Sequence, residues 1–201
     1  MNYIIKGTSR CGKTMLTNLI VQKLVGYNKF STDNFIGAFV SAMPELGINH
    51  ERGKGMKKLF PEFLKSLLDN SKRKDNKLDL YYVLEGVDIS EEVLEEFDKH
   101  DDVTIICLGK PQLTREEYFK QVRHYEEIYL YGEWTKRLSD EELYRYCDYW
   151  INEANYIKKL AEEKGYLFFD TSFEQEKVIK GIFNKIKKSN AKNLQIKPNI
   201  K

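Results

Sequence analysis

Gly7-Thr8-Ser9-Arg10-Cys11-Gly12-Lys13-Thr14, near the amino terminus, is the stretch that decides the fold. It matches the pattern G-x-x-x-x-G-K-[ST], in which the glycines let the backbone curl so that successive N–H groups point inward at a phosphate. A β-branched and aromatic run, Tyr3–Ile5, precedes the stretch, and an apolar pattern of helical spacing follows it from Met15 to Leu24. The sequence therefore predicts a strand, a phosphate-binding loop and a helix whose positive end also faces the phosphate.

The loop pattern assigns roles to its own residues. We expect the Lys13 ammonium to reach the outer phosphates of a nucleotide and to act in catalysis, and the Thr14 hydroxyl to bind Mg²⁺. A chance glycine-rich turn is the alternative interpretation. The expected nucleotide contacts in this region are Gly7, Thr8, Ser9, Arg10, Cys11, Gly12, Lys13, Thr14 and Met15.

Length and composition limit the protein class. A chain of 201 residues suits one domain with insertions. Its 33 basic and 31 acidic residues give no electrostatic reason to expect nucleic acid as a partner. No apolar run has membrane-spanning length and the first strand follows Met1 directly, so we expect a cytoplasmic protein. The three cysteines, Cys11, Cys107 and Cys147, have no paired spacing, which argues against disulfides and zinc.

Strand and helix patterns alternate along the chain. The expected strands are Tyr3–Ile5, Tyr27–Ser31, Leu80–Leu84, Val103–Leu108 and Tyr166–Phe169. The expected helices are Met15–Leu24, Phe35–Ala42, Lys57–Leu68, Glu91–His100, Thr114–Glu127, Asp140–Lys164 and Glu174–Lys187. This alternation predicts an α/β fold with a three-layer, doubly wound, five-stranded parallel sheet over residues 1–187. Residues 188–201 lack periodicity and are expected to form a flexible basic tail.

Two carboxylates close predicted strands, where ligands of such sheets bind. Asp33 follows the second strand, and we expect it to accept a proton from an attacking hydroxyl; the alternative is that Ser31, Thr32 or Asp33 caps the next helix. Glu85 ends the third strand and is expected to hold Mg²⁺ or its water, whereas a structural pairing with a lysine is its alternative.

Four arginines lie between the fourth and fifth strands: Arg115, Arg123, Arg137 and Arg145. Planar guanidinium groups match the charge that spreads over a transferring phosphoryl group. Together with several Tyr and Trp residues, they suggest a lid that closes over a nucleotide. Arg123 and Arg137 are the preferred candidates, although each arginine alone is also typical of a solvated helix surface.

The phosphate loop, the strand ends Ser31-Thr32-Asp33 and Val83-Leu84-Glu85-Gly86, and Asp170-Thr171-Ser172 together resemble the adenylate-kinase-like family of small P-loop kinases. That family includes nucleoside monophosphate kinases, shikimate kinase and the zeta toxins. The resemblance implies a P-loop NTPase fold, ATP and Mg²⁺ as cofactors, a substrate-binding insert near residues 34–77 and a lid near 113–150. It also implies that Asp170, Thr171 and Ser172 lie against the nucleotide base.

The sequence favours an ATP- and Mg²⁺-dependent phosphotransferase acting on a hydroxyl or phosphate of a small metabolite or nucleotide. Typical adenylate kinases carry a substrate-binding arginine soon after the second strand, whereas this chain has none until Arg52, so the resemblance implies hydroxyl-bearing metabolites more than nucleoside monophosphates. A regulatory ATPase or GTPase-type switch without an acceptor is the alternative. The tetrad Asn76-Lys77-Leu78-Asp79 fits a guanine-reading pattern, but it precedes a strand instead of following one. A polynucleotide kinase would need a basic groove that the charge balance does not favour.

Overall fold

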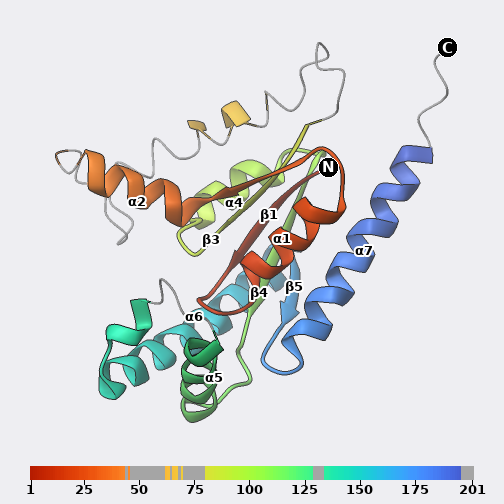
Figure 1. Ribbon diagram of the computed structural model, residues 1–201. Helices are drawn as coiled ribbons and strands as arrows, with labels where there is room; N and C mark the ends of the chain where they lie inside the picture. Colours follow the sequence, from red (N-terminus) through yellow and green to blue (C-terminus); the bar gives the residue numbers. More distant parts are fainter. Residues whose placement is uncertain are drawn as a thin grey trace.

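Five parallel strands form the centre of the molecule (Figure 1). The computed structural model describes residues 1–43, 45, 62, 63, 65–67, 69, 80–128 and 134–195. The strands lie in the order β2-β3-β1-β4-β5, so the strand that leads into the phosphate loop is central. Their bounds are β1 Asn2–Gly7, β2 Tyr27–Ser31, β3 Tyr81–Gly86, β4 Val103–Gly109 and β5 Leu167–Asp170.

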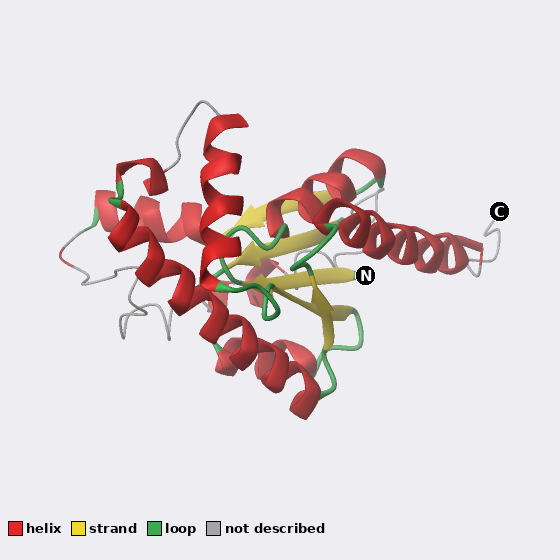
Figure 2. Ribbon diagram, turned by 90° about the horizontal axis from the view of Figure 1, so that it is seen from below, coloured by secondary structure: helices red, strands yellow, loops and turns green. Residues whose placement is uncertain are grey.

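Helices cover both faces of this sheet (Figures 1 and 2). The helical elements are α1 Lys13–Lys23, α2 Thr32–Ala42, α4 Glu91–Asp98, α5 Arg115–Ile128, the 3₁₀ turn η2 Trp134–Arg137, α6 Asp140–Lys164 and α7 Gln175–Gln195. The residues of α1 and α7 pack on one face, and those of α2, α4 and α6 pack on the other. This arrangement confirms the predicted three-layer α/β fold with a doubly wound parallel sheet.

Alternation along β1 explains why the sheet has two cores. Ile4 and Ile5 are both fully buried, but their side chains point to opposite faces because successive strand residues alternate. Ile4 packs in the cluster that contains Phe97 of α4. Ile5 packs in the cluster that contains Leu16 of α1 and Ile179 of α7. A strand buried on both sides favours apolar residues, which Tyr3, Ile4 and Ile5 supply, whereas Asn2 and Lys6 are buried polar residues near its two ends.

A separate apolar cluster holds α5 against α6, and its buried members are Leu113, Tyr118, Val122, Leu143, Cys147 and Trp150. In Figure 1 these two helices extend beyond the end of the sheet at which β4 finishes. The segment predicted as a lid, 113–150, therefore contains a small core of its own. Most of the predicted insert 34–77 lies outside the described residues, as do the Lys57–Leu68 helix in large part, Arg52 and the 76–79 tetrad.

Four helix ends show how far local sequence signals determine where a helix starts and stops. A capping box between Ser139 and Glu142 starts α6, and Gly165, at φ 76°, ends it in the left-handed conformation. The predicted start of α2 at Phe35 was too late, since the helix begins at Thr32 directly after the strand. The predicted end of α7 at Lys187 was too early, because the helix continues through the lysine-rich segment to Gln195.

The contact between Gly86 and Thr32 gives a prediction for stability. A Cβ atom at Gly86 would lie 1.6 Å from the Oγ1 atom of the fully buried Thr32, so Gly86→Ala forces a shift in a packed region. We expect it to lower the free energy of unfolding by about 1–3 kcal/mol, since overpacking costs that much. Thermal unfolding should then begin earlier, with Tm about 2–4 °C lower for each kcal/mol.

Gly37→Ala is the matched control for this substitution. A Cβ atom at Gly37 meets no atom of the described residues within 4 Å, and the residue lies inside α2. This change should raise the free energy of unfolding by about 0.5–1 kcal/mol, because alanine favours the helix. Equal Tm values for the two variants would contradict the packing argument.

Candidate nucleotide-binding site

The phosphate loop lies between β1 and α1 with the backbone shape that the pattern predicts. Arg10 and Gly12 have φ values of 59° and 99°, so the chain turns twice through the left-handed region. Gly12 is the N-cap of α1, which begins at Lys13. A Cβ atom at Gly7 would lie 2.4 Å from the carbonyl oxygen of Leu108, so only glycine allows this approach to β4. The turn thus directs main-chain N–H groups and the positive end of α1 to the carboxyl edge of the sheet.

Lys13 lies folded over this loop. Its Nζ atom donates a hydrogen bond of 2.7 Å to the carbonyl oxygen of Thr8, and the residue is buried. In the part of the chain that the structure describes, no carboxylate pairs with this ammonium. A buried cation held only by a neutral carbonyl is costly, and an anion that enters the loop relieves that cost.

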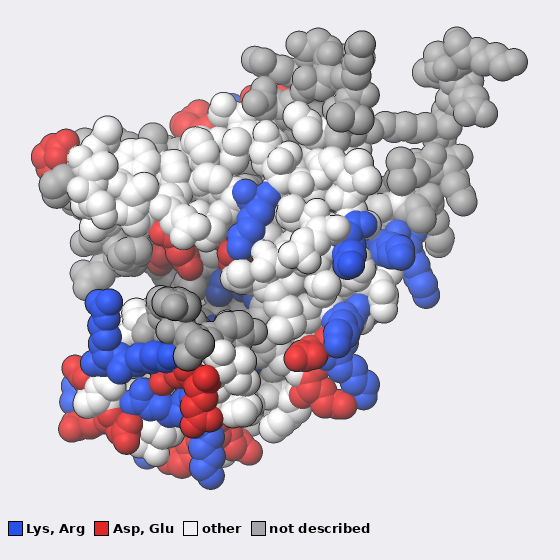
Figure 3. Space-filling model, viewed as in Figure 1, with Lys and Arg blue, Asp and Glu red and all other residues white. Residues whose placement is uncertain are grey.

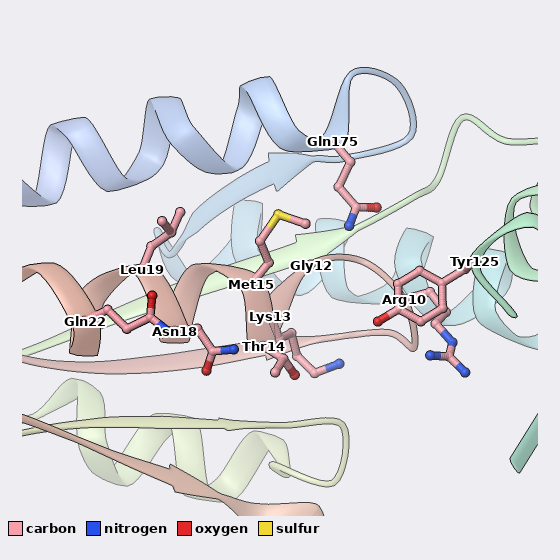
Figure 4. Close-up of a pocket in the computed structure, with 10 residues that line it drawn as sticks. All are labelled: Arg10, Gly12, Lys13, Thr14, Met15, Asn18, Leu19, Gln22, Tyr125 and Gln175. Carbon is pink, nitrogen blue, oxygen red and sulfur yellow. The ribbon is translucent and has the colours of Figure 1, made fainter. Parts of the chain in front are cut away.

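A cavity of about 540 Å³ opens beside the loop (Figure 4). Figure 4 shows the Lys13 and Thr14 side chains at its base, with Gln175 reaching in from the start of α7 and Tyr125 from α5. Its lining residues are Arg10, Gly12, Lys13, Thr14, Met15, Asn18, Leu19, Gln22, Tyr125 and Gln175. The expected contacts from Gly12 to Met15 therefore line the cavity, as does Arg10. Thr8 and Cys11 are instead buried within the loop.

Thr14 and Glu85 meet at the metal position that the sequence predicts. The Thr14 hydroxyl donates to Glu85 Oε1 at 3.3 Å, and the same oxygen lies 3.4 Å from Lys29 Nζ. Glu85 therefore pairs with a lysine, as its structural alternative expects, and it also lies beside Thr14 of the phosphate loop. A hydroxyl and a carboxylate are oxygen ligands of the kind that Mg²⁺ takes. Within the described ranges no three His, Cys, Asp or Glu side chains cluster, so nucleotide phosphates and water would complete the coordination shell.

Asp33 lies at the adjacent strand end. Parallel pairing of β2 with β3 sets Ser31 opposite Glu85, so the residues after both strands reach the same edge. Asp33 Oδ1 accepts a hydrogen bond from the Thr32 hydroxyl at 3.3 Å and lies 3.5 Å from the Val87 amide nitrogen. Ser31 is the N-cap of α2, without a side-chain capping bond, and Asp33 lies in the first turn. The carboxylate is therefore exposed at the edge of the sheet and is not used as the helix cap.

The two preferred arginines differ in their surroundings. Arg123 joins α5 to η2 and α6: it donates to Glu126 at 2.9 Å, to Asp140 at 2.7 Å and to the Leu138 carbonyl at 3.2 Å. Arg137, at the end of η2, has an exposed side chain. Arg123 thus has a structural role in this conformation, whereas Arg137 is exposed to solvent.

Asp170, Thr171 and Ser172 join the loops that follow β4 and β5. Thr171 donates from its amide and its hydroxyl to the Gly109 carbonyl, at 2.8 and 3.1 Å. Asp170 Oδ1 accepts from the Ser172 amide at 2.8 Å, and Ser172 Oγ accepts from the Gln112 amide at 3.1 Å. These residues shape the loop that leads to Gln175, which itself lines the cavity.

Sequence reasoning missed the contacts that connect the loop to α5 and η2. The Tyr118 hydroxyl donates to the Ser9 carbonyl at 2.6 Å. The Arg10 guanidinium lies 4.6 Å from the centre of the Tyr125 ring and donates to the Thr135 hydroxyl at 3.2 Å. Aromatic residues in the predicted lid were the only signal, and it did not indicate which of them would reach the loop.

The arginine contacts predict a difference between two substitutions in this region. Arg123→Met leaves the buried Glu126 carboxylate without its cation, and we expect the free energy of unfolding to fall by about 1–3 kcal/mol. Arg145→Met is the control, because Arg145 forms one exposed helix pair with Glu141, worth about 0.3–0.5 kcal/mol. Chemical denaturation measures both values. Faster hydrogen exchange over 134–142 in the Arg123 variant alone would support the connecting role, and equal effects would refute it.

We compared the sequence and the structure with those of known proteins. No family model matches the sequence, and no curated protein matches it. A shikimate kinase from Bacteroides thetaiotaomicron is 14% identical, with a TM-score of 0.58 over 95% of this chain and 98% of its own. A shikimate kinase from Acinetobacter baumannii, solved in complex with shikimate, is 15% identical, with a TM-score of 0.53 over 100% of this chain and 95% of its own. The chain therefore has the fold of these small P-loop kinases, which confirms the resemblance at the level of the fold.

Proposed function

We propose that this protein is an ATP- and Mg²⁺-dependent phosphotransferase that acts on a hydroxyl of a small metabolite. One observation supports this most strongly: a phosphate loop with a buried lysine stands beside two carboxylates, Glu85 and Asp33, at one edge of the sheet. The fold that the chain shares with two shikimate kinases supports a small acceptor, since one of those structures contains shikimate.

The nucleotide phosphates would lie in the loop between β1 and α1. Main-chain amides and Lys13 would hold them, and Lys13 would exchange its bond to the Thr8 carbonyl for a phosphate oxygen. Thr14 and Glu85 would hold Mg²⁺, which neutralises charge on the phosphates. Lys29 would keep the Glu85 carboxylate oriented towards the loop. The base would lie near the Asp170–Ser172 loop, with Gln175 and Tyr125 at the cavity wall.

Asp33 would orient the acceptor hydroxyl and receive its proton. Its exposed carboxylate follows β2, adjacent to the strand that carries Glu85, and a base must be within hydrogen-bond reach of the proton it takes. An anionic base at this position also needs little reorganisation before the reaction. The acceptor would thus lie between the end of β2 and the phosphate loop.

The segment 113–150 would act as the lid, and part of 34–77 as the substrate-binding insert. Arg137 is exposed and can turn towards the phosphates when the lid closes. Arg123 would have to exchange Asp140 or Glu126 for a phosphate before it could stabilise the transferring group. We therefore rank Arg137 as the first candidate for a catalytic arginine in the lid, and Arg123 as the second.

The surface charge favours a small acceptor over a polynucleotide. In the view of Figure 3, Lys and Arg are interspersed with Asp and Glu over the α5 and α6 region. A strand-binding groove requires basic side chains gathered along a continuous track. The described part of this face shows no such track.

Two substitutions separate nucleotide binding from transfer. Lys13→Ala should abolish measurable ATP binding, because the cation that the phosphates need is removed. Asp33→Asn should bind ATP with nearly unchanged affinity and lose about 10²–10⁴-fold in acceptor-dependent ADP release, since only the base is removed. The assay offers ATP and Mg²⁺ with a panel of nucleosides, sugars, sugar phosphates and hydroxy acids.

Lys177→Met is the control for both variants. Lys177 pairs with Glu174 on the exposed side of α7, so its removal should leave binding and ADP release unchanged. Slow ADP release that no acceptor stimulates would favour the regulatory ATPase over the kinase. Full transfer by Asp33→Asn would show that another group takes the proton.

A further inference from the structure

Lys110 is a buried lysine close to the phosphate loop, in addition to Lys13 and Lys6. It directly follows β4, the strand whose end contacts Gly7, and only 4% of the residue is exposed. Its Nζ atom donates to the Gln121 side-chain oxygen at 2.6 Å and lies 5.6 Å from the centre of the Tyr118 ring. Tyr118 is the residue whose hydroxyl binds the Ser9 carbonyl, so a chain of contacts runs from Lys110 to the loop.

No carboxylate balances this ammonium among the residues that the structure describes. Gln121 is neutral, and its amide nitrogen is bound to the Ser172 carbonyl at 3.2 Å. Asp170, opposite Gly109 on β5, accepts from the Ser172 amide instead. The remaining charged neighbour is Arg10, which is another cation. Of the buried lysines near this loop, Lys13 and Lys110 thus each bind a neutral oxygen.

We infer that Lys110 is a positioning residue for nucleotide binding. Its ammonium places a positive charge in the protein interior behind the phosphate loop, and its amine takes up a proton when a polyphosphate binds. The inference rests on the proposed nucleotide site. An anion in the loop stabilises a nearby cation in a medium of low polarity much more than it would in water. Burying the ammonium without a counter-ion costs free energy in the free protein, and binding of the polyphosphate offsets that cost.

The direction of the proton linkage follows from the surroundings. Burial lowers the pKa of Lys110 to about 8; the neighbouring Cys11 opposes this shift, and the charge of Arg10 adds to it. A polyphosphate favours the ammonium and raises this pKa, so binding above pH 8 takes up a proton. The affinity for the polyphosphate is then highest and constant below about pH 8. Above pH 8 it falls by up to tenfold per pH unit, until the pH reaches the pKa of Lys110 in the bound form.

The other groups that face Lys110 do not titrate in this range. Burial raises the pKa of the Cys11 thiol on the loop and of the Tyr118 phenol on α5, so both stay neutral. The terminal phosphate of ADP has lost its second proton well below pH 8, so ADP itself does not account for proton uptake above pH 8.

The experiment measures ADP binding by isothermal titration calorimetry between pH 7 and 9.5. Two buffers of different ionisation enthalpy give the number of protons taken up. The unmodified protein should take up close to one proton per ADP at pH 9 and almost none at pH 7. Lys110→Met should bind roughly tenfold more weakly at pH 7, with no proton uptake at any pH.

Lys110→Arg keeps the charge and removes the titration. It should therefore bind ADP at pH 9 without proton uptake, an outcome that a purely structural role of Lys110 does not produce. Lys185→Met is the matched control, because Lys185 also lies over a ring, 5.3 Å from the centre of Phe169, but lines a different cavity beside Tyr3. This variant should keep the proton uptake of the unmodified protein.

Each outcome distinguishes this inference from the proposed function. ADP binding without proton uptake at pH 9 would overturn the role of Lys110 and leave the nucleotide site in place. Uptake that persists in Lys110→Met would assign the proton to another group and overturn the inference as well. If the unmodified protein failed to bind ADP at pH 7, the proposed function would be wrong, and this inference with it.

Discussion

The excess of buried positive charge at the carboxyl edge of the sheet is the constraint on which the rest of the site depends. Lys13 and Lys110 are both buried, and each has a neutral oxygen as its partner. The start of α1 adds its positive end at the same place. A protein that only had to be stable would not favour this arrangement, because each desolvated cation without a counter-ion costs free energy. The arrangement is favourable once a polyanion completes it.

At the same edge of the sheet, the negative charge of Glu85 is balanced by a lysine. Its carboxylate is almost completely buried, yet it lies between the Lys29 ammonium and the Thr14 hydroxyl. The lysine lowers the cost of burying the carboxylate, and the carboxylate keeps the hydroxyl near the loop. The charges are thus separated across the cleft: cations lie behind the loop, and two carboxylates lie at the ends of β2 and β3.

The sequence was sufficient for the fold because its signals are local and repeat along the chain. Apolar runs marked most of the strands, with the short and more polar β2 as the exception, and the glycine pattern fixed the turn at which α1 begins. The sequence was not sufficient to predict the polar contacts between residues that are far apart along the chain. Gln121 pairs with Lys110 because α5 folds back across the end of β4, and periodicity carries no information about that crossing. Arg123 was assigned to phosphate by its residue type, whereas packing of α5 on α6 brings Asp140 to its guanidinium.

The contacts between the loop and the predicted lid have a consequence for motion. Ser9 accepts from Tyr118, and Arg10 stacks on Tyr125 and binds Thr135, so both loop residues are held by the segment that would have to close. Tyr118 is fully buried in the α5–α6 core, so its bond to Ser9 moves only if that core moves with it. Arg10 is less restrained, because it lines the cavity and its hydroxyl partner is one that a phosphate oxygen can replace. A nucleotide in the cavity would therefore compete with Thr135 for the Arg10 guanidinium while the Tyr118 contact stays in place. In this way the position of η2 would respond to occupancy of the loop without any loss of packing between α5 and α6.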